Sequence, residues 1–369
     1  MGFAQGAALR IQIHGLRDRL RDLEAFRFAQ PHWLPYRLYL ALAEWKAQHM
    51  LVPGLQRFAP SMLARLKGVA TGAGATVRSL ALMNALEALL SQVAGRITVA
   101  PFGACSALAI RGSRSRTGEP VLARNFDYLP LAQPFYTLRE SRPRDGWRSL
   151  DFVVAPQAGT IDGLNEKGLC LTLNYAFMTD PGRPAPLITM AIADALAHCA
   201  SVQEAADRIA RQPRWGAGII MLVDAAGDLA ALELSNTRSA LRRPATGADW
   251  LAFTNVCHCP ETRAIQVPAT ATFSDRVPRP LRGQPVLQWH SDRASRIEQL
   301  LGELGALGND DLAAIMSDHG PTGIPDGSSP CVHTNYWCTT AALQWFPRRR
   351  AVRAWYGTAC EAQYVEIAL

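Results

Sequence analysis

Pairs of short apolar runs separated by turn-forming residues constrain this chain more than any other feature. Residues 107–112 (ALAIRG) and 121–126 (VLARNF) flank SRSRTG, a pattern typical of two antiparallel strands joined by a turn. Three later pairs of runs flank the turn-rich segments 159–168, 225–228 and 347–350. Single strands are also expected at 251–255 and 364–369. The chain is therefore expected to form antiparallel sheets.

Helical periodicity dominates the remaining segments. Within the first hundred residues, Leu16, Leu20 and Leu23 fall on one helical face, and apolar positions from 77 to 90 mark an amphipathic helix. Further helices are expected at 36–50, 187–200, 291–304 and 309–316. Sheets with helical blocks between them favour an α+β fold in which helices cover the sheets.

Composition excludes several classes of protein. The chain has 369 residues, 49% hydrophobic and 19% charged, as expected of a globular protein with a sizeable core. No window of eighteen uninterrupted apolar residues appears, so no membrane span is expected. The N-terminus lacks the pattern of a secretory signal, which favours a cytoplasmic location. The net charge of +7 comes from arginines spread along the chain, so no nucleic-acid partner is expected.

The eight cysteines do not form the pattern of a disulfide framework. The only close pair is Cys257 and Cys259, with His258 between them. A structural zinc site needs a second pair of ligands at a matching spacing, and none is evident in the sequence. No metal and no cofactor are therefore expected.

One cysteine stands where chemistry is possible. Small residues, Gly103 and Ala104, precede Cys105 at the start of the first expected strand, and Arg124 and Asp127 follow in the segment ARNFDY. Taken alone, a cysteine is most often a small buried hydrophobic residue, and an arginine–aspartate pair is most often a salt bridge.

In combination, GACSAL and ARNFDY resemble the N-terminal-nucleophile cysteine hydrolases. The resemblance is to the branch that contains acyl-coenzyme A:6-aminopenicillanic acid acyltransferase and, more distantly, to choloylglycine hydrolases and penicillin V acylases. Further segments resemble this family in the same order, at 161–175 (IDGLNEKGLCLTLNY), 251–255 (LAFTN), 291–301 (SDRASRIEQLL), 317–319 (SDH) and 331–333 (CVH). The resemblance spans roughly residues 60–369.

The resemblance implies a four-layer αββα fold and synthesis as a precursor. It implies cleavage between Ala104 and Cys105, with a mainly helical segment 1–104 retained beside the catalytic segment 105–369 as one domain. The new α-amine of Cys105, with an ordinary pKa near 8, would then act as general base for its own thiol, so no histidine is required.

The same resemblance implies roles for individual side chains. Cys105 is the expected nucleophile, and Asp127 the carboxylate that holds its α-ammonium group. Arg124 is expected to favour the thiolate. Asn174 is the expected oxyanion donor, and Asn255 a second amide near the new amine.

A late arginine is expected to join them, from a helix that offers two. Arg293 and Arg296 lie three residues apart, and alignment on the following leucine pair favours Arg293. The sequence departs from the family pattern where Val256 follows the Thr-Asn pair and where Ala104 precedes the nucleophile.

Two loops flanking the expected site are rich in aromatic residues. They are expected to hold an acyl or aromatic group through Tyr128, Phe135, Tyr175 and Phe177. The activity implied is hydrolysis or transfer at a linear amide C–N bond through a thioester, with a small-molecule amide or acyl donor as partner. The alternatives are an acyl-coenzyme A-dependent N-acyltransferase acting on a small amine, and a non-catalytic binding protein on the same fold.

Overall fold

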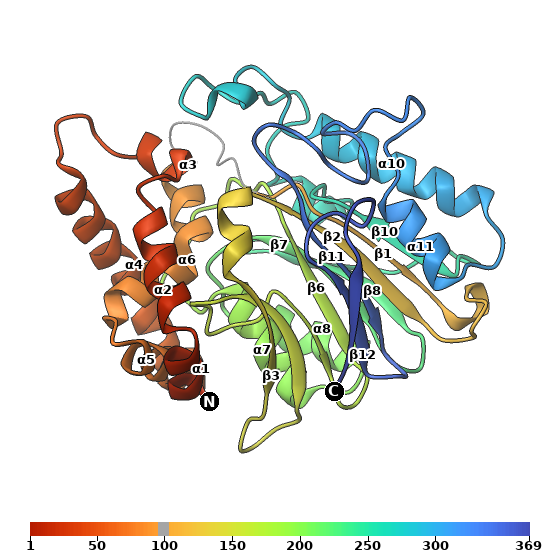
Figure 1. Cartoon of the computed structure of the whole chain (residues 1–369), viewed down its shortest axis with the longest axis horizontal. Helices are drawn as coiled ribbons and strands as arrows, with labels where there is room; N and C mark the ends of the chain where they lie inside the picture. The colour runs from red at the N-terminus through yellow and green to blue at the C-terminus, as the bar shows by residue number, and fades with distance from the viewer. Residues whose placement is uncertain (95–102) are drawn as a thin grey trace.

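The computed structural model describes residues 1–94 and 103–369, and within them two antiparallel sheets lie face to face between helical layers (Figure 1). The six-stranded sheet has the order β10-β1-β2-β11-β12-β13. Its strands are β1 (Ser106–Ile110), β2 (Val121–Tyr128), β10 (Trp250–Phe253), β11 (Cys338–Phe346), β12 (Ala351–Trp355) and β13 (Tyr364–Ala368).

The seven-stranded sheet follows chain order from β3 to β9. Its strands are β3 (Tyr136–Ser141), β4 (Ser149–Val154), β5 (Asp162–Asn165), β6 (Cys170–Tyr175), β7 (Gly218–Val223), β8 (Leu229–Leu234) and β9 (Ser239–Arg242). Alternate residues of a strand face opposite sides, so Ile219 and Met221 of β7 join the core between the sheets, whereas Ile220 and Leu222 face outward.

Helices cover the outer face of each sheet. On the seven-stranded sheet lie α7 (Ile188–His198) and α8 (Val202–Arg211), which bury Ile220 and Leu222. On the six-stranded sheet lie α10 (Gln288–Glu303) and α11 (Asn309–Met316), drawn in blue in Figure 1. These layers form the αββα sandwich that the resemblance implied.

A separate group of helices precedes the sandwich, drawn in red to orange in Figure 1. Its members are α1 (Gly2–Ala8), α2 (Arg10–Arg19), α3 (Glu24–Phe28), α4 (Tyr36–Phe58), α5 (Pro60–Ala73) and α6 (Val77–Ala94). The group is fixed to the turn after β4, because Gln5 Nε2 donates to Gln157 O at 2.8 Å and Asn84 Nδ2 donates to Pro156 O at 2.9 Å. The mainly helical N-terminal segment is thus confirmed for residues 1–94, while 95–102 lie outside the described residues.

Most expected elements are present, and one expectation needs correction. The turn-rich segment 159–168 contains strand β5, and strands β3 and β9 are present in addition to the expected ones. The loop 260–289 carries the short helices α9 (Pro260–Arg263) and η3 (Arg279–Leu281). Strand β5 is not evident from the sequence, because its four residues, DGLN, have the composition of a turn. Only pairing with β4 and β6 makes them a strand.

Among the residues that the structure describes, no helix has both the length and the apolar character needed to cross a membrane.

Candidate active site

Cys105 lies immediately before β1, a strand in the interior of the six-stranded sheet, and its side chain is buried. The chain reaches it through Gly103, which has a φ of +69°. A Cβ atom at this position would lie 2.6 Å from Cβ of Tyr175, so only glycine fits there. The next residue, Ala104, donates its N–H to Asp127 O at 3.3 Å. The small residues noted in the sequence therefore allow a close approach of the backbone to β2 and β6.

Arg124 of β2 directs its guanidinium to the thiol. Its Nη2 donates to Cys105 Sγ at 3.1 Å and to Leu173 O at 2.6 Å, and its Nη1 forms a buried ion pair with Asp162 of β5. Asp162 Oδ1 also accepts a hydrogen bond from Leu173 N at 3.1 Å. The predicted contact between Arg124 and Cys105 is thus present, and Asp162 fixes the arginine from the opposite sheet.

The pKa of Cys105 is nevertheless raised in the uncut chain. Burial of the thiol is the largest cause, and the positive charge of Arg124 offsets only part of it. The sequence analysis expected Arg124 to favour the thiolate. The positive charge of Arg124 lowers the pKa of the thiol, but burial of the thiol raises this pKa by more.

Asp127 lies at the end of β2, opposite a bulge in β11 between Thr339 and Ala341. Its Oδ1 accepts a hydrogen bond from Thr339 Oγ1 at 2.6 Å, and its Oδ2 lies 3.8 Å from Arg293 Nη1. Within the described chain, Oδ2 has no hydrogen-bond partner. Burial raises the pKa of Asp127 to about 6, although Arg293, Thr339 and Arg124 oppose this rise.

The structure brings Arg293, not Arg296, to this site. Arg293 is fully buried in α10, where its Nη1 donates to Gly327 O at 3.1 Å and its Nη2 lies 2.7 Å from His290 Nδ1. Arg296 points elsewhere and forms an ion pair with Asp318 at 2.9 Å. Helical geometry separates the two arginines because only the first faces the sheet.

The two asparagines differ in how their amides are used. Asn174 of β6 donates from Nδ2 to both Cys105 O, at 3.1 Å, and Thr254 O, at 2.9 Å. Both of its amide hydrogens are therefore engaged with backbone around the nucleophile. Asn255 donates to Tyr175 O at 2.8 Å and accepts a long hydrogen bond of 3.5 Å from Arg293 Nη2, which leaves one of its amide hydrogens without a partner among the residues that the structure describes.

Sequence reasoning missed three residues that orient this site, namely Asp162, Thr339 and His290. Asp162 lies inside a segment that resembles the family, but its neighbours have the composition of a turn, so the local sequence does not mark it as a residue of the site. Thr339 and His290 are distant in sequence from the residues they contact, and no local pattern marks either one. Their contacts with Asp127 and Arg293 appear only once the sheets and α10 are assembled.

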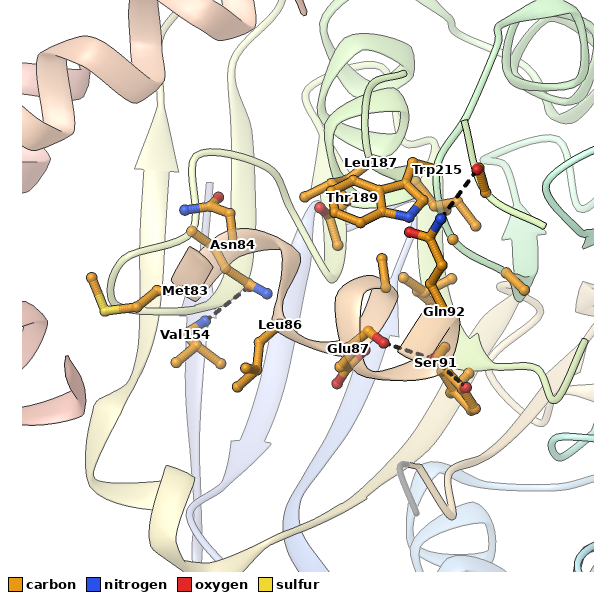
Figure 2. Close-up of a pocket in the computed structure, with 18 of the residues that line it drawn as sticks. Met83, Asn84, Leu86, Glu87, Ser91, Gln92, Val154, Leu187, Thr189 and Trp215 are labelled. Atoms are coloured by element: carbon orange, nitrogen blue, oxygen red, sulfur yellow. Dashed lines mark hydrogen bonds between the residues drawn. The ribbon is translucent and has the colours of Figure 1, made fainter. Parts of the chain in front are cut away.

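A cavity of about 220 Å³ opens between α6, the sandwich and the start of α7 (Figure 2). Apolar side chains such as Met83, Leu86 and Val154 form much of its wall, and α6 contributes four polar residues, Asn84, Glu87, Ser91 and Gln92. Leu173 also lines it. Since Arg124 Nη2 contacts both Leu173 O and Cys105 Sγ, a single side chain joins the cavity wall to the thiol.

Two of the four expected substrate-binding residues line this cavity, namely Tyr128 and Tyr175. The other two do not. Phe135 ends the 3-10 helix η2 (Pro130–Phe135) and is turned toward Gly15 of α2. Phe177 follows β6 into the next loop and packs against His290 at a ring distance of 5.3 Å. Proximity in sequence to Asp127 and Asn174 was therefore a poor guide for these two rings.

Cys105 before an interior strand of an αββα sandwich, contacted by Arg124 from the next strand, is the arrangement that the sequence resemblance to N-terminal-nucleophile cysteine hydrolases implied. The family model for acyl-coenzyme A:6-aminopenicillanic acid acyl-transferase matches residues 114–301. The chain belongs to this family, which consists of enzymes that act on amide bonds. The match includes Arg124, Asp127, Asn174, Asn255 and Arg293 and begins after Cys105.

Solved structures of three enzymes are similar at low identity. A Caenorhabditis elegans ortholog of N-acylethanolamine-hydrolyzing acid amidase has 14% identity and a TM-score of 0.45, covering 66% of this chain and 93% of its own. Penicillin V acylase from Agrobacterium tumefaciens has 15% identity and a TM-score of 0.45, covering 72% and 86%. A conjugated bile acid hydrolase from Clostridium perfringens has 14% identity and a TM-score of 0.42, covering 72% and 92%. No curated protein matches the chain by sequence.

Proposed function

We propose that this protein is a self-processing amidohydrolase in which Cys105 is the nucleophile for both its own cleavage and substrate turnover. The observation that carries the proposal is the contact of 3.1 Å between Arg124 Nη2 and Cys105 Sγ, with Asp127 three residues further along the same strand. A fixed cation beside a thiol stabilises the thiolate in the moment of attack.

In the cleavage step, Cys105 Sγ attacks the carbonyl carbon of Ala104. The C–S bond forms, the bond from this carbon to Cys105 N breaks, and the thiol proton passes to the released nitrogen. Water then hydrolyses the thioester and leaves a carboxylate on Ala104 and a free thiol. This product has an α-amine on Cys105, the general base that the thiol lacks in the uncut chain.

In turnover, the α-amine takes the thiol proton while Sγ attacks the substrate amide. The amine of the substrate leaves with that proton, and water hydrolyses the acyl-thioester. Asp127 is proposed to hold the α-ammonium group, because its buried Oδ2 has no hydrogen-bond partner within the described chain. Asn174 and Asn255 supply the amide groups around the reacting carbonyl, and the amide hydrogen of Asn255 that has no partner within the described chain is proposed to donate to it.

The N-terminal segment is proposed to stay bound after cleavage. Four residues from α2 and the turn after it, and seven from α6, line the same cavity as Tyr128 and Tyr175. The hydrogen bonds of Gln5 and Asn84 to the turn after β4 also remain when the bond at Ala104 is cut. Loss of this segment would expose a large apolar surface to water.

The cavity supports an apolar acyl group as the part of the substrate that is recognised. Small-molecule sites are typically concave and apolar with a few polar groups, and this cavity has that character. The proposed substrates are therefore linear amides of a small aliphatic or aromatic acid.

The test is formation of an acyl adduct. Processed protein is incubated with a panel of N-acyl amides, quenched in acid, and its larger fragment is weighed by mass spectrometry. An increase equal to the acyl group is expected on the peptide that begins at Cys105. Cys105→Ala is expected to give no adduct, whereas Cys199→Ala, which removes a buried thiol beside α7, keeps it. An adduct on Cys105→Ala would refute the proposed nucleophile.

Acyl transfer from coenzyme A to an amine is the second candidate, because the matching family model describes an acyl-coenzyme A acyl-transferase. The two activities share the thioester and differ in what enters and leaves. Release of free coenzyme A that depends on an added amine would identify transfer, whereas amine release from an amide without any thiol donor would identify hydrolysis.

A further inference from the structure

A cluster of two histidines and two cysteines lies outside the site described above. It consists of His319, Cys331, His333 and Cys360, all beyond residue 301, where the family match ends. We propose that these four side chains bind one structural zinc ion. The sequence does not indicate this site, because closely spaced ligand pairs are the usual sign of a zinc site and here only Cys331 and His333 are close in sequence.

The distances within the cluster fit tetrahedral coordination. Cys331 Sγ lies 3.2 Å from His333 Nε2 and 3.5 Å from Cys360 Sγ, and Cys360 Sγ lies 3.5 Å from His333 Nε2. With Zn–S bonds of about 2.3 Å and Zn–N bonds of about 2.0 Å, ligand atoms in a tetrahedron are separated by roughly 3.3–3.8 Å. The ligand atoms of all four residues lie within 4.8 Å of one another.

An unsatisfied nitrogen completes the set. His319 Nε2 is buried and has no hydrogen-bond partner among the residues the structure describes. Its ring is perpendicular to that of His333, at 86°, with ring centres 5.2 Å apart. A buried polar atom normally has a partner, and a metal ion at the centre of the cluster would supply one.

The ligand types point to zinc rather than to calcium or magnesium. Calcium and magnesium prefer oxygen ligands, whereas two thiolates and two imidazoles are a common zinc set. Binding would release the two thiol protons, so that the charge of the ion is balanced by Cys331 and Cys360. Four protein ligands leave no open position for a substrate, which makes the role structural.

The ion would fasten the loop before β11 to the C-terminal segment before β13. Within this loop, Cys331 N donates to Asp318 O at 3.1 Å, and Thr339 N donates to Val332 O at 2.8 Å. Thr339 then donates its hydroxyl to Asp127 at 2.6 Å. The proposed zinc site therefore steadies the residue that positions the carboxylate of the active site.

The test is the metal content of the full-length protein, purified without chelators or a metal-affinity tag. Elemental analysis is expected to find about one zinc per chain, because the four protein ligands form a single structural site. After removal of metal and reduction, titration with Co²⁺ is expected to give the intense visible absorption of tetrahedral cobalt bound to thiolates. This titration uses the wild-type protein, so it does not depend on the folding of a variant.

Matched variants locate the ion. Cys360→Ser changes an exposed residue and is expected to abolish stoichiometric zinc and the cobalt absorption while circular dichroism stays native. Cys259→Ser, in the sequence group Cys257–Cys259, is expected to retain both. Zinc-free protein without a cobalt spectrum would overturn the proposal, as would a Cys331–Cys360 disulfide in peptide maps, or a different metal at one ion per chain.

Discussion

Two buried thiols of this protein, Cys105 and Cys331, lie in surroundings that differ in one decisive respect. Burial raises the pKa of both. Cys105 faces a guanidinium held in place by Asp162 and the carbonyl of Leu173, whereas Cys331 faces an imidazole and a second thiol. A fixed cation stabilises a thiolate that must attack, whereas neighbouring soft donors form a set that can share an ion. Burial alone therefore does not distinguish a nucleophile from a ligand, and the neighbours do.

The two regions are nevertheless connected through a short segment. Thr339 contacts both Val332, next to Cys331, and Asp127, three residues from Arg124. Helix α10 joins them again, since Arg293 lies beside Asp127 and Arg296 is paired with Asp318, the neighbour of His319. A change at one thiol site can therefore affect the other. Measuring acylation and metal content on the same variant separates the two effects.

The largest effect is expected for Arg124→Gln. Acylation of Cys105 should fall by about 10³-fold, the upper end of the effect of removing one charge-stabilising donor. Stability should fall by about 3–5 kcal/mol, because Asp162 would remain as an unpaired buried charge. Adduct formation and urea unfolding measure the two effects.

A second substitution separates these effects. In Arg124→Gln combined with Asp162→Asn, stability should largely return but acylation should not. Zinc content should stay unchanged in both variants. A single variant that acylates at the wild-type rate would show that the thiol does not depend on the cation.

An intermediate effect is expected for Asn174→Ala. Loss of one amide donor should lower the acylation rate by about 10²- to 10³-fold with little change in fold. Single-turnover kinetics with a chromogenic amide measure this rate. If Asn174→Ala reacts normally and Asn255→Ala does not, the oxyanion is held by Asn255, and Asn174 only orients the backbone of Cys105.

The pH dependence of cleavage should show a smaller effect. The pKa of Asp127 is raised to about 6, so this carboxyl becomes neutral as the pH falls through 6 and can no longer stabilise the positive charge that develops on the Cys105 nitrogen as the bond breaks. Self-cleavage should therefore slow by about tenfold for each pH unit below 6. Gel analysis of freshly refolded precursor at a series of pH values measures the rate.

The processed enzyme provides the contrast for this experiment. In turnover the α-amine must be neutral to accept the thiol proton, and its pKa, ordinarily near 8, is raised further by the charge of Asp127, so turnover should lose activity at a higher pH than cleavage, whose acid limb below pH 6 belongs to Asp127. Asp127→Asn should be slow in both reactions and lack this acid limb. An acid limb that persists in Asp127→Asn would assign the titration to another group.

The smallest effect is expected for Arg296→Gln. Its ion pair with Asp318 is partly exposed, so stability should change by about 1 kcal/mol or less. Acylation should stay at the wild-type rate, because Arg296 is turned away from Asp127. Arg293→Gln, measured beside it, should be strongly impaired. Equal impairment of both variants would mean that the helix as a whole, rather than Arg293, is required.

The sequence predicted the sandwich better than it predicted its contacts. Nearly continuous apolar runs in β7 and β8 reflect burial of both faces, and such runs predict strands without knowledge of their neighbours. Strand β5 lacks this pattern because its residues serve the site, with Asp162 bound to Arg124. Local sequence therefore failed where function replaced ordinary strand composition.

The site residues were likewise predictable only where their contacts are local in sequence. Cys105, Arg124 and Asp127 come from adjoining strands, and their contacts could be anticipated from a short stretch of chain. His319 and Cys360 are brought together by the folding of segments more than forty residues apart, so spacing in sequence concealed the cluster. Phe135 was expected near the substrate from its proximity in sequence to Asp127, whereas its ring lies against Gly15 of α2.

The central claim is that Cys105 releases its own amino group, and the N-terminal sequence of the fragments tests it most directly. Freshly purified wild-type protein should separate on a denaturing gel into two fragments that co-purify under native conditions. Edman sequencing of the larger one should begin Cys-Ser-Ala-Leu, and Cys105→Ala should remain a single full-length chain. Uncut wild-type protein that hydrolyses amides at full rate, or cleavage of Cys105→Ala at the same bond, would contradict the account.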